Sequence, residues 1–194
     1  MSGRGPGRRP GTPDTRGAIL AAARRSFAER GFERTTMRAI AVAAGVTPGL
    51  VHHFFGAKDD LFLEALAVPF DPRQMLAGAV EGPPSGLGER IASEVLHTWE
   101  DEVQRDALLA FLRAAMTNSE VAALLRTGMP TIALGALDEV VNGSDAPVRV
   151  ELVFSQMLGV AIARYVVEVE PLASLPVDEL ARRLGPVLQH HLLG

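Results

Sequence analysis

The chain has 194 residues, of which 47% are hydrophobic and 22% charged, and its formal net charge is −4. It contains no cysteine, which excludes a disulfide framework and thiolate chemistry and suits a reducing cytoplasm. No run approaches 18 apolar residues and the first residues lack the apolar region of a secretory signal, so we expect a soluble, cytoplasmic protein with no membrane partner. Aromatic residues make up 5%, and valine and isoleucine are scattered among alanine and leucine instead of alternating with polar residues, so we predict an all-α fold.

The net charge hides two oppositely charged halves. Residues 1–58 contain ten Lys or Arg and only three acidic residues, a net charge of +7, which leaves −11 for the remainder. Such asymmetry indicates a nucleic-acid-facing module attached to a soluble body.

Residues 1–11 are rich in Gly, Pro and Arg and cannot bury a core, so we predict a disordered basic arm. Arg4, Arg8 and Arg9 either form a solvated tail or contact DNA phosphates and a minor groove, as homeodomain arms do, and we favour the second interpretation. The first helix is then expected to begin after Thr12 as N-cap, with Pro13 in its first position, and to end at Gly31.

Residues 35–58 are expected to form two short helices joined by a tight turn. Thr35 or Thr36 caps the first, Gly45 supplies the left-handed residue that ends it, and Thr47 caps the second, which Gly56 ends. Ordinary helical hairpins share this pattern, but it is also typical of the helix-turn-helix unit, whose second helix lies in the DNA major groove.

The same stretch resembles the TetR family of bacterial transcriptional repressors. The resemblance rests on Phe27, Gly31-Phe32, the sequence TTMRAIA from Thr35, and the sequence GVTPGLVHHFFGAK from Gly45, and it covers roughly Thr12 to Leu66. The chain departs from the family at His52, where tyrosine is commonest, at Phe54, where histidine is usual, and at Leu50, which replaces a frequent hydroxyl residue. The resemblance implies a helix-turn-helix domain at 12–57 and a ligand-binding and dimerisation domain at 58–194.

Nine residues are the candidates for DNA contacts. We expect Thr36, Thr47, His52 and Lys58 to contact phosphates, and Arg38, Gly49, Leu50 and His53 to reach base edges, with Pro48 as a further candidate contact. An arginine can pair with guanine in a bidentate manner, whereas Leu50 can only meet a thymine methyl group.

The body is predicted as a series of helices. They are expected at about 58–66, 72–80, 87–103, 105–117, 119–141, 146–168 and 176–193, with Pro130 bending or splitting the fifth of them. The last two are apolar around much of their circumference, which requires burial on more than one side. A central helix of a monomer would satisfy this, but the TetR resemblance implies a four-helix homodimer interface through residues 145–193, where Gly159, Ala163 and Gly185 would permit close approach and Leu158 and Leu184 would lie.

The TetR resemblance and the Met-rich and aromatic-rich middle helices together predict an effector site for a small, mainly apolar molecule. The candidate lining residues are Met75, Leu96, Trp99, Phe111, Met116, Met157 and Tyr165, with His97, Asn118 and Gln156 as further polar anchors.

We predict neither catalysis nor a metal or other cofactor, because no nucleophile, base and orienting group and no i, i+4 histidine pair occur at workable spacing. The overall hypothesis is a repressor that binds double-stranded operator DNA and is released by its effector. The alternative is a helical protein-interaction module that does not bind DNA.

Overall fold

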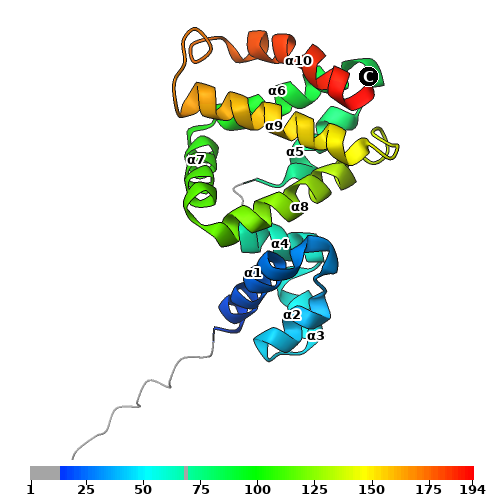
Figure 1. The fold of residues 1–194 in the computed structure, drawn as a ribbon, viewed down its shortest axis with the longest axis vertical. Helices are drawn as coiled ribbons and strands as arrows, with labels where there is room; N and C mark the ends of the chain where they lie inside the picture. Colours follow the sequence, from blue (N-terminus) through cyan, green and yellow to red (C-terminus); the bar gives the residue numbers. More distant parts are fainter. Residues whose placement is uncertain (1–13, 68–69) are drawn as a thin grey trace, which may run out of the picture.

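The computed structural model describes residues 14–67 and 70–194, and within those ranges all regular structure is helical, as predicted. A small group of helices lies at one end of the molecule and a larger bundle at the other (Figure 1). The predicted arm at 1–11 and the predicted cap at Thr12 and Pro13 lie outside the described residues, as does Pro69.

The small group, which we call the head, begins with α1 (Thr15–Arg34), α2 (Met37–Ala44) and α3 (Pro48–Phe55). Asp14, rather than Thr12, caps α1, and its carboxylate accepts a hydrogen bond from the Gly17 N–H at 2.8 Å. Gly31 interrupts the helical backbone with φ of 76°. The buried Thr35 hydroxyl donates to the carbonyls of Ser26 and Gly31, at 3.0 and 2.8 Å, and fixes the turn into α2.

The head joins the body through α4 (Lys58–Leu66), which packs against both α1 and α8. Three buried aromatic rings form the centre of this junction between head and body. Phe62 of α4 meets Phe27 and Phe32 edge to face, with ring centroids 5.1 Å apart in both pairs. The connection between head and body is therefore a continuous hydrophobic core rather than a loose linker.

The body contains α5 (Pro72–Val80), a short 3₁₀ turn (Pro84–Gly86), α6 (Leu87–Glu100), α7 (Glu102–Thr117), α8 (Ser119–Leu137), α9 (Ala146–Tyr165) and α10 (Val177–Leu193). In Figure 1, α6, α9 and α10 lie at the end remote from the head, while α8 runs diagonally from the α4 region toward α9.

Four predicted helix boundaries were wrong, and one of them is the start of α7, which begins at Glu102 instead of 105. The helix expected at 87–103 ends at Glu100, because Asp101 adopts extended backbone angles and its side chain caps α7 by accepting from Gln104 N–H at 3.0 Å. The helix expected to reach 141 ends at Leu137, and α8 passes Pro130 without being split. The helix expected to reach 168 ends at Tyr165, with Glu168 in the left-handed region at φ 54°.

A pair of glycines brings α6 and α10 into backbone contact. A Cβ placed on Gly88 would lie 2.3 Å from the Gly185 carbonyl oxygen, and one on Gly185 would lie 2.8 Å from Glu89 Cα. Gly185 therefore packs against α6 and Leu184 is buried within the chain, so neither residue of this pair is free for the dimer contact predicted for it.

Candidate DNA interface and ligand cavity

The hairpin of α2 and α3 is held by caps at each helix end. Thr36 Oγ1 accepts from the Ala39 N–H at 3.1 Å, and Thr47 Oγ1 accepts from the Leu50 N–H at 3.4 Å. Gly45, with φ of 69°, ends α2, and the next N–H, of Val46, donates to the Ala41 carbonyl at 3.0 Å. The ends of the two helices are therefore set by hydrogen bonds and a glycine within the hairpin itself, and no partner is needed to set them.

One face of α3 is buried and the other is exposed. Val51 and Phe55 lie in the core, whereas Gly49, His52 and His53 are exposed. A side chain on Gly49 would meet nothing within 4 Å. These three positions follow helical spacing, so they form a surface that can approach a groove closely.

The other predicted contact residues surround this face. Thr36, Arg38, Thr47 and Pro48 are exposed, and Leu50 is half-buried. Arg38 makes no hydrogen bond or ion pair with any residue of 14–67 or 70–194, so its guanidinium is free to bind. His52 Nδ1 lies 3.0 Å from the Gly56 carbonyl, which orients its ring at the end of α3.

Lys58 is engaged within the head. Its ammonium donates to the Phe32 carbonyl at 3.2 Å and lies 4.1 Å from the centroid of the Phe32 ring. An ammonium has three N–H donors, so a phosphate contact stays possible, but Lys58 also ties α4 to the end of α1. The sequence pattern gave no indication of this second role.

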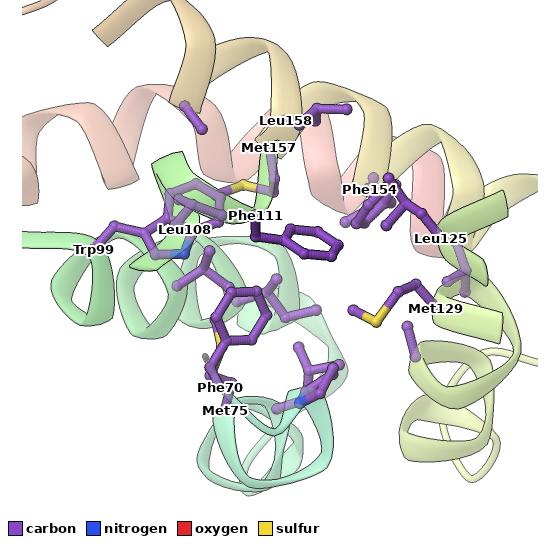
Figure 2. A pocket seen from close by; sticks show the side chains of 18 of the residues that line it. Phe70, Met75, Trp99, Leu108, Phe111, Leu125, Met129, Phe154, Met157 and Leu158 are labelled. Atoms are coloured by element: carbon purple, nitrogen blue, oxygen red, sulfur yellow. The ribbon is translucent and has the colours of Figure 1, made fainter. Parts of the chain in front are cut away.

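The body contains a partly open apolar cavity of about 100 Å³ between α5, α6, α7, α8 and α9. Figure 2 shows Trp99, Phe111 and Met157 around it, with Met75 and Phe70 below. Four of the seven predicted lining residues are present: Met75, Trp99, Phe111 and Met157. All of the lining residues are apolar, and the one polar side-chain atom among them, Trp99 Nε1, is itself buried.

The other predicted lining residues lie elsewhere. Leu96 is fully buried outside the cavity, and Met116 is 70% exposed because α7 turns that side outward. Tyr165 does not line the cavity, and the suggested polar anchors His97, Asn118 and Gln156 are exposed. Sequence reasoning missed Phe70, Ile91, Leu125, Met129, Phe154 and Leu158, since helical periodicity marks an inward residue without showing whether it faces a void or a neighbour.

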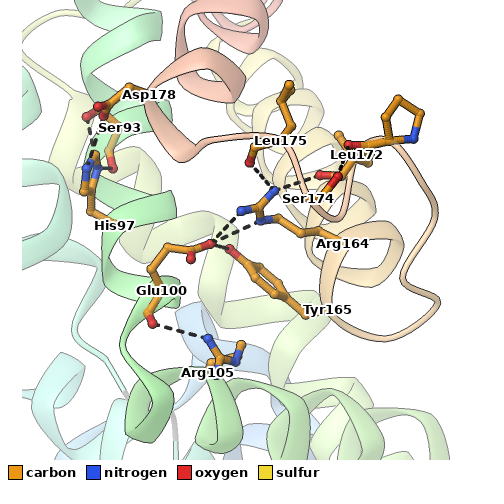
Figure 3. Close-up of polar contacts among 11 residues, drawn as sticks. Ser93, His97, Glu100, Arg105, Arg164, Tyr165, Leu172, Ser174, Leu175 and Asp178 are labelled. Carbon is orange, nitrogen blue, oxygen red and sulfur yellow. Dashed lines mark hydrogen bonds and ion pairs between the residues drawn. The ribbon is translucent and has the colours of Figure 1, made fainter.

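Tyr165 belongs instead to a polar cluster at the end of α9 (Figure 3). Its hydroxyl donates to Glu100 Oε1 at 2.8 Å, and the buried Arg164 donates to the same oxygen at 3.0 and 3.2 Å. Burial raises the pKa of Tyr165 to about 12, assisted by the hydrogen bond to Glu100. Burial opposes ionisation of Glu100, but the hydrogen bonds from Tyr165 and Arg164 outweigh it and lower the pKa of that carboxyl.

Arg164 also binds the segment after α9. Its guanidinium donates to the carbonyls of Leu172 and Leu175 at 2.7 and 2.8 Å. The cluster therefore fastens the 166–176 segment and the end of α9 to the end of α6, directly beside Trp99.

α9 leaves an apolar face uncovered. Val148 is 58% exposed and Leu152 is 40% exposed, and Val187 on α10 is 42% exposed. By length and composition α9 is the one helix of the described ranges that could by itself cross a membrane, and only 28% of its apolar window is buried within the chain.

A helical hairpin with one buried face, whose capped second helix exposes the other face, defines a helix-turn-helix protein. Residues 19–65 match the family described as bacterial regulatory proteins, tetR family, and residues 85–192 match the tetracyclin repressor-like C-terminal domain. The chain belongs to the TetR family of transcriptional regulators.

The chain is similar to several members of the family. A TetR-family regulator from Streptomyces coelicolor A3 is 38% identical over 97% of this chain and 100% of that one, with a TM-score of 0.46. The HTH-type transcriptional regulator UidR of Escherichia coli K12 is 34% identical over 121 residues, 61% of this chain and 60% of UidR. The HTH-type transcriptional repressor AcnR of Corynebacterium glutamicum is 46% identical over 50 residues, 26% of this chain and 27% of AcnR. The chain thus spans about 60% of the length of the first of these curated relatives.

Proposed function

We propose that this protein is a cytoplasmic repressor that binds operator DNA as a homodimer and leaves it when a small, mainly apolar molecule occupies the body. The observation that carries the proposal is the exposed face of α3, where Gly49, His52 and His53 are presented by a helix whose opposite side is buried. Family membership supports it, as does the name of AcnR, a transcriptional repressor that resembles the head.

The positions of the exposed residues support separate roles in DNA binding. In this proposal Arg38, Gly49, Leu50 and His53 reach base edges, with Pro48 beside them. Thr36, Thr47, His52 and Lys58 contact phosphates. Base contacts give sequence preference and phosphate contacts give affinity that falls with salt.

The uncovered apolar face of α9 and α10 supports the homodimer. Val148, Leu152 and Val187 would be covered by a second copy, which would remove these apolar side chains from water. Two copies related by a two-fold axis would present two α3 helices to successive major grooves.

The apolar cavity supports the effector site, because it lies between helices that connect to the head. α8 contributes Met129 and Leu125 to the cavity and packs against α4 and α1 of the head. An effector that binds one arrangement of α8 more tightly than the other would shift the equilibrium between DNA-binding states by that difference in affinity.

The proposal is tested by selecting a bound duplex from random DNA and measuring its affinity by gel shift at low and moderate salt. We expect one preferred pseudo-palindromic sequence, with binding that weakens as salt rises. A basic head that binds no duplex even at low salt would instead favour the helical protein-interaction module.

A further inference from the structure

Phe54 places an apolar ring at the surface of α3, the helix proposed to enter the major groove. The side chain is 38% exposed. Its ring centroid lies 5.6 Å from that of the exposed His53, in an edge contact, and 6.2 Å from that of the buried Phe55. Phe54 is therefore held between a residue of the core and a residue proposed to contact bases, with part of its ring in water.

The two edges of the exposed face of α3 differ in chemistry. Successive residues of an α-helix are turned by about 100°, so His53 lies opposite the buried side. Leu50, which is half-buried, and Phe54 are one turn apart and share one edge of this face. The other edge carries His52, whose Nδ1 lies 3.0 Å from the Gly56 carbonyl oxygen. One edge of α3 is thus apolar and the other carries an imidazole.

An apolar edge can recognise one feature of the major groove. Most groups that the base pairs present there are hydrogen-bond donors or acceptors, and the C5-methyl group of thymine is the apolar one. The ring of Phe54 has no polar atom, so it can neither pair with a guanine, adenine or cytosine edge nor bind a phosphate. Contact with a thymine methyl group removes apolar surface of both partners from water.

We propose that Phe54 is a specificity-determining residue that contacts a thymine methyl group, with Leu50 beside it on the same edge of α3. This inference rests on the proposed binding of α3 in a major groove. In Figure 1, α3 lies at the end of the molecule remote from α9 and α10. A homodimer formed through those two helices therefore leaves the Phe54 ring exposed to DNA.

The test uses the duplex selected from random DNA, together with versions in which one thymine at a time is replaced by deoxyuridine. Uracil pairs with adenine as thymine does and lacks only the methyl group. At one or more thymines, the loss of the methyl group should weaken binding about fourfold, the equivalent of roughly 0.8 kcal/mol for one buried methyl group. Gel shift or fluorescence anisotropy measures the ratio of the two dissociation constants.

Two variants assign the methyl contact to a side chain. Phe54→Ala removes the ring, so the deoxyuridine and thymine duplexes should bind this variant equally at the sensitive position. His52→Ala changes the opposite edge, so it should weaken binding of both duplexes and retain the penalty for the missing methyl group. Each ratio compares two duplexes on the same protein, so an unfolded fraction of a variant cancels.

The outcomes separate this inference from the proposed function. A selected duplex in which no thymine responds to the loss of its methyl group would overturn the role of Phe54 and leave DNA binding by α3 standing. A penalty that persists in Phe54→Ala would overturn it too, and its loss in Leu50→Ala would assign the contact to Leu50. Binding to no duplex at low salt would reject the proposed function itself.

Discussion

Phe62 of α4 lies directly against the backbone of α8 at Gly128. A Cβ added to Gly128 would lie 1.9 Å from Phe62 Cζ, closer than any non-bonded contact. Phe62 is completely buried, and the same ring packs against Phe27 and Phe32 of the head. Since Met129, the next residue of α8, lines the cavity, this contact links the cavity wall to the aromatic core of the head.

Gly128→Ala should destabilise the protein by about 1–3 kcal/mol, because the added methyl group overpacks Phe62. The matched control is Gly135→Ala in the same helix, where a Cβ meets nothing within 4 Å. That change should be neutral or stabilise by about 0.5–1 kcal/mol, since alanine loses less backbone entropy than glycine. Urea unfolding followed by circular dichroism measures both. Equal effects of the two substitutions on stability would show that the contact between Phe62 and Gly128 does not limit the side chain that position 128 can hold.

Leu152 on α9 and Leu184 on α10 should respond differently to substitution. Leu152→Glu changes an exposed position on α9, so the variant should stay folded but sediment as a monomer at concentrations where the parent is a dimer. Leu184→Ala removes most of a buried side chain and should lower the free energy of unfolding by about 2–5 kcal/mol, whether the protein is a monomer or a dimer. A folded monomer in the parent protein would refute the interface.

His53→Ala and Arg38→Ala should relax sequence preference by about 1–3 kcal/mol at the contacted base pair, because both side chains are exposed beside the face of α3. Thermal stability should hardly change. Arg113→Ala, which removes an exposed arginine from α7 of the body, is the charge-matched control. The measurement compares the affinities of the two head variants and the control for the selected duplex and for single-base variants of that duplex. An unchanged sequence preference in both head variants would show that other residues contact the bases.

Lys58→Ala should weaken binding to all duplexes similarly and make the dependence of log K on log salt shallower by about 1. It should also lower the stability of the head, because the hydrogen bond to the Phe32 carbonyl and the contact with its ring are lost. Lys58→Arg retains the charge and is the comparison. A stability loss with an unchanged salt slope would assign Lys58 to structure alone.

The Tyr165 cluster predicts a stability loss in alkaline solution. The pKa of Tyr165 is near 10 in the unfolded chain and about 12 in the folded one, so the contribution of this group is complete below pH 10 and is lost as pH rises toward 12. Tyr165→Phe should remove this component of the pH dependence. Because the chain has one tyrosine, tyrosinate absorbance follows the titration directly. A titration midpoint near 10 in the folded protein would show that the hydroxyl is not held by Glu100.

The sequence by itself determined the local elements of the head. Thr36, Gly45, Thr47 and Gly56 act within one turn of their own position, so their cap and left-handed roles can be read from neighbouring residues. The all-helical class and the basic head are likewise properties of composition and periodicity, which do not depend on how helices pack.

Tertiary structure decided which inward side chains face a cavity, which face another helix and which stay uncovered. Gly185 is small and Leu184 is apolar, as residues of a dimer contact often are, yet Gly185 packs against α6 and Leu184 is buried within the chain. Met116 and Met157 are alike in sequence terms, but one is exposed and the other lines the cavity. Helical spacing fixes the direction of a side chain around its own axis, whereas the neighbour it meets depends on helix crossings set by contacts distant in sequence, such as Phe62 against Gly128.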